Sequence, residues 1–464
     1  MSFLGLFNGK SFSGGVHVPE FKETTCHLPI RRFPFAPTLI VPLSQHTGAP
    51  AIPLVREGQE VVRGEPIAKA GGFVSVPMHA PATGRVERIA LAPSARGDLS
   101  PAIYIKPYPS SSQEILYGAP QDIEHMSSEE IIAAVQNTGV VGLGGAAFPT
   151  HVKMKLPAGK VVDTVIVNGC ECEPYLTTDH RVMVEEAIEV LHGARIAMKA
   201  MNAPHGIVGV EDNKPDAVEA LEKALGSATD IEVRAVPTKY PQGAEKVLIK
   251  VLLDREVPSG GLPSEIGVAV FNVATLAQIG DLLPRSRGLI ERVVTITGPG
   301  VTKPGNYLIA LGTPLRWALE QAGCTNEAAS VILGGPMMGP AISSFDVPFT
   351  KGVTGVLVLT KREINVVEHV YPCIKCGKCV GACPMHLNPS RLGLLARKSR
   401  YEEMETEFHV NDCFECGCCT YVCPSHIPLV QYFRIAKQLN RERKVRVQQT
   451  EPIAETVAAV KVSA

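Results

Sequence analysis

The sequence predicts a multidomain α/β protein that ends in a helical, cysteine-rich domain. The chain has 464 residues, which is too long for one hydrophobic core, so three to five domains are expected. Its middle part alternates apolar strand-like runs with helical periodicity, which is typical of a parallel sheet covered by helices. Its 13 cysteines are clustered, and nine of them lie between Cys373 and Cys423.

The composition excludes two broad classes of protein. Hydrophobic residues make up 45% and charged residues 20%, as in ordinary globular proteins, and the net charge of −1 gives no basic field for nucleic acid. The opening MSFLGLFNGK lacks the pattern of a signal peptide, and no apolar run reaches the roughly 20 residues of a membrane helix. We expect a soluble protein without a transmembrane segment.

Residues 1–35 are expected to form an N-terminal arm, and residues 36–110 a small β-sandwich. The stretch VREGQEVVRGEPIA places apolar and glycine residues three positions apart: Val55, Gly58, Val61, Gly64 and Ile67. The pattern resembles the barrel-sandwich module of lipoyl and biotinyl domains. The hairpin GGFVSVP has no lysine for cofactor attachment, so we interpret this domain as structural.

Residues 120–285 are expected to form a Rossmann-like parallel α/β domain with a ligand at the carboxyl ends of its strands. The predicted strands are mostly apolar on both faces: Val161–Val167, Gly206–Val210, Ile231–Val236 and Gly267–Val273. Between them, apolar residues recur at helical spacing from Val184 to Met198, and PDAVEALEKALG opens with a proline and ends with Gly226.

Two smaller domains and a tail are expected after residue 285. Residues 290–361 read as strand, turn, strand, helix and two further strands, a compact module that resembles the β-grasp SLBB type. Residues 364–442 contain the cysteines and two amphipathic segments, which predict a helical ferredoxin domain. Residues 443–464 are charged and then Ala/Val-rich, and are expected to be a flexible tail.

The clustered cysteines contain one motif twice. Both copies follow C-x2-C-x2-C-x3-C-P, in which three thiolates of one loop bind one [4Fe–4S] cluster and the fourth binds the other cluster. We therefore assign the ligands to two sets. Set I is Cys373, Cys376, Cys379 and Cys423, and set II is Cys413, Cys416, Cys419 and Cys383.

Structural zinc is the alternative interpretation of these cysteines. Zinc takes four ligands, usually as two separated pairs. Three evenly spaced cysteines followed by a fourth are not typical of zinc sites. The spacing therefore favours iron–sulfur clusters, close enough together to exchange single electrons. Cys418 falls outside the motif, and we expect it to lie beside a cluster without being a ligand.

A glycine-rich loop, GVVGLGGAAFPTHVK, runs from Gly139 to Lys153. Its glycines allow the backbone to approach a ligand, and their N–H groups can cradle a phosphate: Gly142, Gly144 and Gly145. Phe148 offers a stacking face, and Lys153 offers a positive charge. Taken alone, such a loop is equally well explained as a plain tight turn.

An acidic loop, VIVNGCECEPYLTTDHR, raises the odds of a binding site. Asn168, Glu171 and Glu173 directly follow a predicted strand, at the ligand-binding edge of an α/β sheet. The alternative is a solvated acidic loop. Metal binding by Cys170 and Cys172 stays open, although C-x-C alone supplies too few ligands.

Five motifs in order give a specific resemblance: GLGGAAFPTHVK, VNGCECEPYLTTDHR, KYPQGAEKVLIK, FNVATLAQI and ITGPGVTKPGNY. Together with the double cysteine motif and the opening FSGGVHVPEFKETTCHLPIRR, they resemble the C subunit of Rnf (or Rsx) electron-transport complexes over nearly the whole chain. They also resemble, more remotely, the NADH-binding flavoprotein subunit of respiratory complex I.

The resemblance implies FMN and NAD(H) binding in the α/β domain. It implies that the three loop glycines and Lys153 hold FMN, and that Asn168, Glu171 and Glu173 line the flavin and nicotinamide side. It further implies a pocket completed by Glu245, Asn272 and Thr275, with Phe148 stacked on NADH. Two positions depart from the complex I pattern. This chain has Leu143 where the pattern has an arginine, and Cys170 where the pattern has an aspartate.

The resemblance also implies a function. NADH reduces FMN, and single electrons pass through two [4Fe–4S] clusters to another subunit of an ion-translocating membrane complex, or return from ferredoxin to NAD⁺ through that subunit. Such a translocase component is a peripheral NADH-dependent oxidoreductase on the cytoplasmic face of the bacterial inner membrane. It needs no catalytic acid or base, and none is predicted. The sequence does not set the coupling ion, Na⁺ or H⁺.

Three alternatives stay open. In the first, the chain is only an electron relay and scaffold without its own NADH site. In the second, it reduces a redox-sensing regulator. In the third, it is a quinone-linked protein like the A subunit of the sodium-pumping quinone reductase. The last relative lacks the paired cysteine motifs. Two candidate docking surfaces are the helix after Pro424 and the apolar residues of the first ten: Phe3, Leu4, Leu6 and Phe7.

Overall fold

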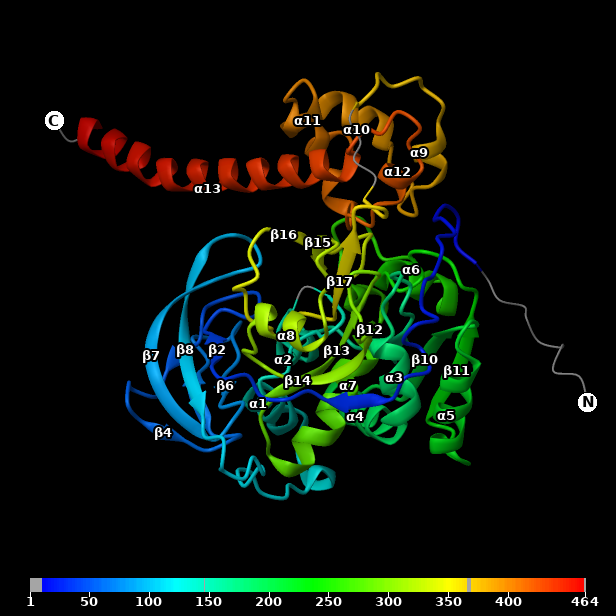
Figure 1. The fold of residues 1–464 in the computed structure, drawn as a ribbon. Coiled ribbons are helices and arrows are strands. Elements are labelled where there is room, and N and C mark those ends of the chain that lie inside the picture. The colour runs from blue at the N-terminus through cyan, green and yellow to red at the C-terminus, as the bar shows by residue number, and fades with distance from the viewer. Residues whose placement is uncertain (1–10, 146, 365–368, 463–464) are drawn as a thin grey trace, which may run out of the picture. The chain divides into compact units, whose positions relative to one another are not determined.

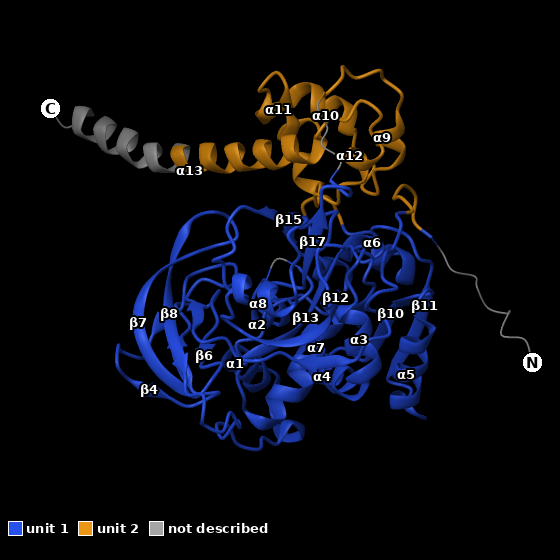
Figure 2. Ribbon diagram, viewed as in Figure 1, with its two compact units in different colours: residues 1–11, 18–257, 261–365 blue, residues 12–17, 258–260, 366–464 orange. Residues whose placement is uncertain are grey.

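The computed structural model describes residues 11–145, 147–364 and 369–462, with side chains up to residue 446 (Figure 1). The chain divides into two compact units (Figure 2). The second unit consists of Phe12–His17, Pro258–Gly260 and Val366–Ala464, and the first unit of the remaining residues. The apolar residues proposed for docking in the first ten positions lie outside the described residues. No helix in the described ranges is both long and apolar enough for a membrane span.

The predicted β-sandwich is present in the first unit as two antiparallel sheets. One has the order β2–β8–β7–β4, and the other β3–β5–β6: Leu39–Pro42, Leu99–Pro107, Gly84–Pro93, Glu60–Val61, Ile52–Pro53, Pro66–Lys69 and Met78–His79. The structure explains why apolar and glycine residues recur every three positions in residues 55–67. Val55, Val61 and Ile67 are buried in the sandwich core, while Gly58 and Gly64 have φ of 82° and 92° and form the turns between them.

The predicted parallel sheet follows, in the order β11–β10–β9–β12, with all neighbouring pairs parallel. Its strands are Ile231–Val236, His205–Glu211, Thr164–Gly169 and Val268–Asn272, each within three residues of a predicted range. The helices around it are α1 to α7: Ser128–Thr138, Thr150–Met154, Thr178–Glu185, Ala187–Met201, Pro215–Leu225, Glu245–Leu253 and Val273–Leu282.

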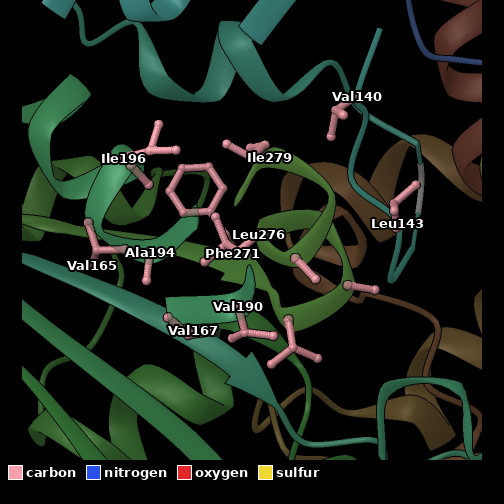
Figure 3. Close-up of a cluster of buried hydrophobic side chains, with 14 of the residues drawn as sticks. Val140, Leu143, Val165, Val167, Val190, Ala194, Ile196, Phe271, Leu276 and Ile279 are labelled. Atoms are coloured by element: carbon pink, nitrogen blue, oxygen red, sulfur yellow. The ribbon is translucent and has the colours of Figure 1, made fainter. Parts of the chain in front are cut away.

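The core of this domain packs α4 and α7 against the sheet. The ring of Phe271, at the end of β12, lies between Ile196 of α4 and Ile279 of α7 (Figure 3). α4 and α7 can approach closely because Gly193 of α4 has no side chain. A Cβ at this position would overlap the carbonyl of Leu276 in α7. Close packing of both helices fixes the position of the β12 carboxyl end, where predicted site residues lie.

The predicted β-grasp module forms a six-stranded sheet in the order β1–β14–β13–β17–β15–β16. The strands are Ile30–Arg32, Gly305–Ala310, Glu291–Thr297, Gly355–Thr360, Ala328–Leu333 and Ala341–Ile342, with α8 at Leu315–Gln321. β1 comes from the segment interpreted as an arm, and it pairs in parallel with β14. Residues 18–35 are therefore part of the first unit rather than a free extension.

The second unit is the predicted helical domain. Its helices are α9, α10, α11, α12 and α13: Lys378–Gly381, Pro389–Ala396, Tyr401–Thr406, Cys418–Tyr421 and Leu429–Val462. A small core of Leu392, Met404, Val410 and Phe433 holds α10, α11 and α13 together. The expected tail continues α13, and its side chains from residue 447 onward lie outside the described residues.

Two short segments from earlier in the chain belong to this second unit. Gly15 N donates to Ala382 O at 3.0 Å, and Gly260 N donates to Asp412 Oδ1 at 3.1 Å. Gly14 has φ of 74°, and a Cβ there would lie 2.7 Å from the carbonyl oxygen of Cys383. The Gly-Gly of the opening FSGG motif thus lets the chain pack directly on the end of the first cysteine motif.

Candidate functional site

The carboxyl ends of four parallel strands share one edge of the central sheet. β9 ends at Gly169, β10 at Glu211, β11 at Val236 and β12 at Asn272. The strand ends and the segments that follow carry five of the residues predicted to bind FMN or NADH: Asn168, Glu171, Glu173, Glu245 and Asn272. The structure therefore brings residues from distant parts of the chain to the ligand-binding edge of an α/β sheet.

Asn168 joins two of the loops at this edge. Its Nδ2 donates to Gly243 O at 2.8 Å, in the loop after β11, and its Oδ1 accepts from Cys170 N at 3.1 Å. A Cβ on Gly243 would overlap the carbonyl oxygen of Cys170, so these loops are in close contact. The amide of Asn168 is thus used to fix the edge itself.

The glycine-rich loop approaches the same edge. It is closed by a bridge between Val141 and Pro149, and Gly142 N donates to Phe148 O at 2.8 Å. A Cβ on Gly144 would lie 2.7 Å from Asn272 Nδ2, whereas the space beside Gly145 is open. Glycine at 144 therefore lets the loop reach the end of β12. The Phe148 side chain is 39% exposed and can stack on a ligand.

A chain of hydrogen bonds holds this loop to the sheet edge. Leu143 N donates to Thr275 Oγ1 at 2.9 Å, and Thr275 N donates to Asn272 Oδ1 at 3.2 Å, which caps α7. Asn272 Nδ2 in turn donates to Asp179 Oδ2 at 2.6 Å. The predicted residues Asn272 and Thr275 therefore position the loop.

Arg292 of β13 completes the chain, and the sequence interpretation missed it. Its Nη2 donates to Leu143 O at 3.3 Å, and its fully buried guanidinium is close enough to Asp179 for the two charges to interact. Burial lowers the pKa of Arg292 to about 10, against the opposing effect of Asp179. An arginine from another domain thus supports the position where the complex I pattern has its own arginine. The only sequence signal was a charge within the apolar run ERVVTIT.

Lys153 and Glu245 form an ion pair at this edge. Lys153 Nζ also lies 5.6 Å from the centroid of the Phe271 ring, which favours a cation. Both charged side chains are about one-third exposed, at 33% and 36%. A ligand phosphate can therefore compete with Glu245 for the ammonium group of Lys153.

Lys22 organises the acidic loop, and the sequence interpretation gave it no role. It is 8% exposed, and its Nζ donates to the carbonyls of Glu171 and Glu173, at 2.8 and 2.9 Å, and of Leu176. Burial lowers the pKa of Lys22. No pattern in FKETTC marks this residue, because its contacts lie some 150 positions away in the chain.

Glu171 and Glu173 have different surroundings. The Glu171 carboxylate accepts from Asp179 N at 2.9 Å and His180 N at 3.2 Å, in the first turn of α3. Glu173 Oε2 accepts from Met337 N at 3.0 Å, and burial raises the pKa of Glu173 to about 7. Burial, with the nearby charge of Glu171, also raises the pKa of Asp179 to about 7.

Several buried polar atoms of these segments have no hydrogen-bond partner among the described residues. They are Glu173 Oε1, Asp179 Oδ1 and both amide atoms of Gln242. Unsatisfied buried polar atoms are uncommon in folded proteins and often mark a missing ligand or water. Together with Lys153 and the glycine-rich loop, whose N–H groups at Gly142 and Leu143 bond within the protein, they fit a polar, phosphate-bearing ligand such as FMN.

Cys170 lies buried beside this edge, and Cys172 is partly exposed. Burial raises the pKa of both. Within the described ranges, no three His, Cys, Asp or Glu side chains converge so as to hold a single metal ion. The described part of the chain thus offers this C-x-C pair no further ligands.

The cysteines of set I surround one cavity in the second unit. Cys373, Cys376, Cys379 and Cys423 all line it, together with Ser390, Gly393, Leu394 and Arg397. Burial raises the pKa of Cys379, and the neighbouring thiols of Cys423, Cys373 and Cys376 add to this effect. A cavity bounded by four thiols, three from one motif and one from the other, fits a [4Fe–4S] cluster.

The cysteines of set II are also brought together, and they are less exposed. Burial raises the pKa of Cys413 to about 11, and the thiols of Cys416 and Cys383 add to this effect. Burial also raises the pKa of Cys419, with further contributions from Cys413, Cys416 and Cys383. Cys383 of the first motif thus accompanies three cysteines of the second, although the assignment of ligands to each cluster stays a prediction.

Cys418 is fully buried beside set II. A hydrogen bond with Cys416 raises the pKa of Cys418 well above its usual range, and burial adds to the effect. A protonated thiol is a poor metal ligand but a weak hydrogen-bond donor. These surroundings suit a neighbour of the cluster better than a ligand.

Four family models match the chain. They are described as RnfC barrel sandwich hybrid domain over residues 10–108, Nuo51 FMN-binding domain over 135–281, SLBB domain over 293–341 and 4Fe-4S dicluster domain over 372–427. The matches confirm the predicted fold class, domain by domain. They also confirm the expectation of FMN and of two [4Fe–4S] clusters.

Curated relatives are similar over most of the chain. The C subunit of a proton-translocating ferredoxin:NAD(+) oxidoreductase complex from Clostridium ljungdahlii is 45% identical, covering 93% of this chain and 94% of the relative. The C subunit of the Na(+)-translocating complex from Acetobacterium woodii is 42% identical, covering 85% and 89%. The C subunit of an ion-translocating oxidoreductase complex from Erwinia tasmaniensis is 39% identical, covering 99% of this chain and 57% of the relative.

Proposed function

The chain belongs to the family of C subunits of ion-translocating oxidoreductase complexes, the Rnf family, and from this premise we propose that it is the NADH-oxidising subunit of such a complex. When bound, FMN takes up the electron pair of NADH, and the [4Fe–4S] clusters carry electrons singly to another subunit. Through that subunit the complex exchanges electrons with ferredoxin, and the reverse flow to NAD⁺ uses the same path.

One observation carries the proposal for the flavin site. The carboxyl edge of the sheet holds unsatisfied polar atoms of Glu173, Asp179 and Gln242 in the segments that adjoin the glycine-rich loop. In the proposed site Lys153 and the loop N–H groups not already used by Gly142 and Leu143 would bind phosphate. Gly145 would leave room for the flavin, and Phe148 would stack on NADH. Asn168, Asn272 and Thr275 keep these parts in place.

The two cysteine sets are proposed as the cluster ligands. Set I lines a cavity, and set II lies in a more buried part of the same unit. Cysteine thiolates are the usual ligands of [4Fe–4S] clusters, and on binding iron would replace the proton of each thiol. The second unit would thus provide two electron stations in one helical domain.

We place the protein at the periphery of the complex, on the cytoplasmic face of a bacterial inner membrane, because NADH and ferredoxin are cytoplasmic reactants. The coupling ion is Na⁺ or H⁺, and the names of the relatives from Clostridium ljungdahlii and Acetobacterium woodii differ on this point. A second candidate function is an electron relay without its own NADH site. Leu143 and Cys170 favour it, since they stand where the complex I flavoprotein pattern has an arginine and an aspartate.

Anaerobic purification of the full chain, with cofactor analysis, tests the proposal. We expect FMN and about eight irons per chain, and a flavin absorbance that bleaches when NADH is added. Iron without flavin, and no response to NADH, would instead support the relay. Zinc, or no metal, at the cysteines would contradict both.

A further inference from the structure

The two cysteine motifs of the second unit are related by an internal repeat, yet their surroundings differ. Each cysteine of the first motif corresponds to one of the second, as Cys373 does to Cys413 and Cys383 to Cys423. α9 and α12 begin at corresponding positions, Lys378 and Cys418. Lys375 and Glu415 also correspond, and both have positive φ, 58° and 65°. The backbone is therefore repeated while the side chains around it are not.

The first difference is exposure. Cys376 is exposed, whereas Cys416 and Cys419 are 8% and 7% exposed. Apolar side chains around Cys376 are also exposed: Ile374 at 67%, Val380 at 41% and Leu394 at 37%. Ile374 and Leu394 line the same cavity as the cysteines of set I. The cluster of set I would thus lie near an apolar patch of surface.

The second difference is charge. Residues 369–400, which contain the first motif, α9 and α10, include six basic and no acidic residues: Lys375, Lys378, Arg391, Arg397, Lys398 and Arg400. Arg391 and Arg400 pair with Glu403. Among the described residues, no ion pair joins an acidic side chain to any of the other four. In the second motif Glu415 is neutralised by Arg434 and Lys437. The uncompensated positive charge therefore belongs to the side of set I.

We propose that this surface, which we call the set I face (Ile374, Lys375, Cys376, Lys378, Leu394 and Arg397), is where an acidic face of another redox subunit of the same complex docks. This inference rests on the proposed function. An exposed cluster ligand is the natural point of electron exchange, because tunnelling rates fall steeply with distance. Basic side chains around it select an acidic partner and steer its approach.

The apolar residues indicate a partner that stays bound. A soluble carrier that binds briefly needs little more than complementary charge, and such encounters bury small areas. Ile374 and Leu394 line the set I cavity with Arg397, and Lys375 and Lys378 lie next to Ile374 and Cys376 along the chain. Apolar side chains with basic neighbours are typical of the apolar core and polar rim of a lasting interface. An exposed apolar patch beside a cluster is also better protected when another subunit covers it.

The test is charge reversal in the assembled complex. The variant Lys375→Glu/Lys378→Glu changes no predicted ligand, and Lys375→Glu introduces the side chain that Glu415 already has at the corresponding backbone position. The matched control is Arg441→Glu on α13, an exposed residue about 18 Å along the helix axis from Leu429. Iron content and EPR spectra of both variants should match the parent, which shows that the clusters are intact.

Electron transfer from reduced ferredoxin to NAD⁺ by the purified complex is the first measurement. We expect the double variant to lose at least about tenfold at low ionic strength, with a weaker salt dependence, and Arg441→Glu to stay within about twofold. NADH-dependent ferricyanide reduction by the isolated holo-chain should be unchanged in both variants. Unchanged turnover of the complex in the double variant would overturn the proposal.

A second measurement separates a partner subunit from free ferredoxin. Reduced ferredoxin is mixed with the isolated holo-chain, and cluster reduction is followed. The double variant could slow cluster reduction in the isolated chain by the same factor as it slows turnover of the complex. That result would assign the set I face to soluble ferredoxin and overturn the choice of a bound partner. If the parent chain itself shows no NADH-dependent ferricyanide reduction, the proposed function fails, whereas the effect of charge reversal on ferredoxin-linked transfer still decides the docking surface.

Discussion

The cysteine unit and the carboxyl edge of the central sheet are built in opposite ways. The predicted cluster ligands come from two neighbouring motifs, and a few local helices hold them. The sheet edge gathers side chains and backbone groups from Lys22 to Met337, and buried hydrogen bonds and charges hold them together. The first design depends on a few covalent bonds, so its failure should be all-or-none. The second depends on many weak contacts, so its failure should be graded.

The largest expected effect tests the all-or-none site. Cys383→Ser should lower the iron content from about eight toward about four per chain, because it removes one of the four thiolates that hold one [4Fe–4S] cluster. The EPR spectrum that remains should equal that of Cys416→Ser. Cys423→Ser should in the same way equal Cys376→Ser. Cys418→Ser is the control and should keep about eight irons.

Identical remaining spectra for Cys383→Ser and Cys376→Ser would contradict the crossed assignment, because both cysteines would then serve one cluster. The structure predicts the crossed pattern, since Cys423 lines the cavity of set I and Cys383 lies near Cys413 and Cys419.

The next effect tests the graded site. Lys22→Met removes the donor that serves the carbonyls of Glu171, Glu173 and Leu176. Buried carbonyls left without a donor cost about 1–3 kcal/mol each, so we expect the free energy of unfolding to fall by about 3 kcal/mol. Urea denaturation followed by circular dichroism measures it. Lys69→Met, at an exposed position of β5, should change it by no more than about 0.5 kcal/mol. Equal losses in both variants would refute the role of Lys22.

A smaller effect depends on pH. Burial raises the pKa of Glu173 in the folded state to about 7, from 4.5. Between these values the folded chain binds more protons than the unfolded chain, so this group makes stability fall as pH rises from about 4.5 to 7. Glu173→Gln should remove the contribution of Glu173 to this pH dependence, about 2 kcal/mol in the free energy of unfolding over that range. The contribution of Asp179 should remain. The same pH slope in the parent and the variant would rule out a buried, titrating Glu173.

The smallest effect concerns the support of the glycine-rich loop. Arg292→Gln weakens the contact with Leu143 O and removes one of the two cations, with Lys22, whose charge favours the ionised form of Asp179. We expect the dissociation constant of FMN, measured by fluorescence titration, to rise about tenfold, or about 1.4 kcal/mol. Arg32→Gln, on the exposed strand β1, should leave it within about twofold. A variant that binds FMN like the parent would show that Arg292 serves only the protein fold.

The same contrast explains what the sequence could predict. The cysteine motifs could be interpreted because ligand spacing along one loop is set by the cluster itself. The strands of the α/β domain could be located because both faces are buried, which leaves continuous apolar runs such as Thr164–Gly169. Asn168 stood out because it directly follows a predicted strand, whereas Asn272 and Thr275 were implied by the family resemblance alone. The structure places these two residues at the end of β12 and in the first turn of α7.

Lys22, Arg292 and the strand β1 could not be predicted in this way. Lys22 contacts carbonyls that are distant in sequence, and Arg292 reaches Leu143 from a different domain. β1 joins its sheet by pairing with β14, which lies far along the chain, so a three-residue strand leaves no periodicity to detect. Such residues are specified by tertiary structure rather than by a local pattern.

The central claim is that NADH reduces a flavin in this chain, and that the cysteine-bound clusters receive the electrons afterwards. Rapid mixing of the anaerobic holo-chain with NADH, followed by absorbance and by EPR of frozen samples, tests it most directly. We predict that flavin absorbance bleaches first and that reduced-cluster signals follow. Clusters that become reduced in a chain stripped of FMN, or a flavin that NADH leaves oxidised, would contradict the account.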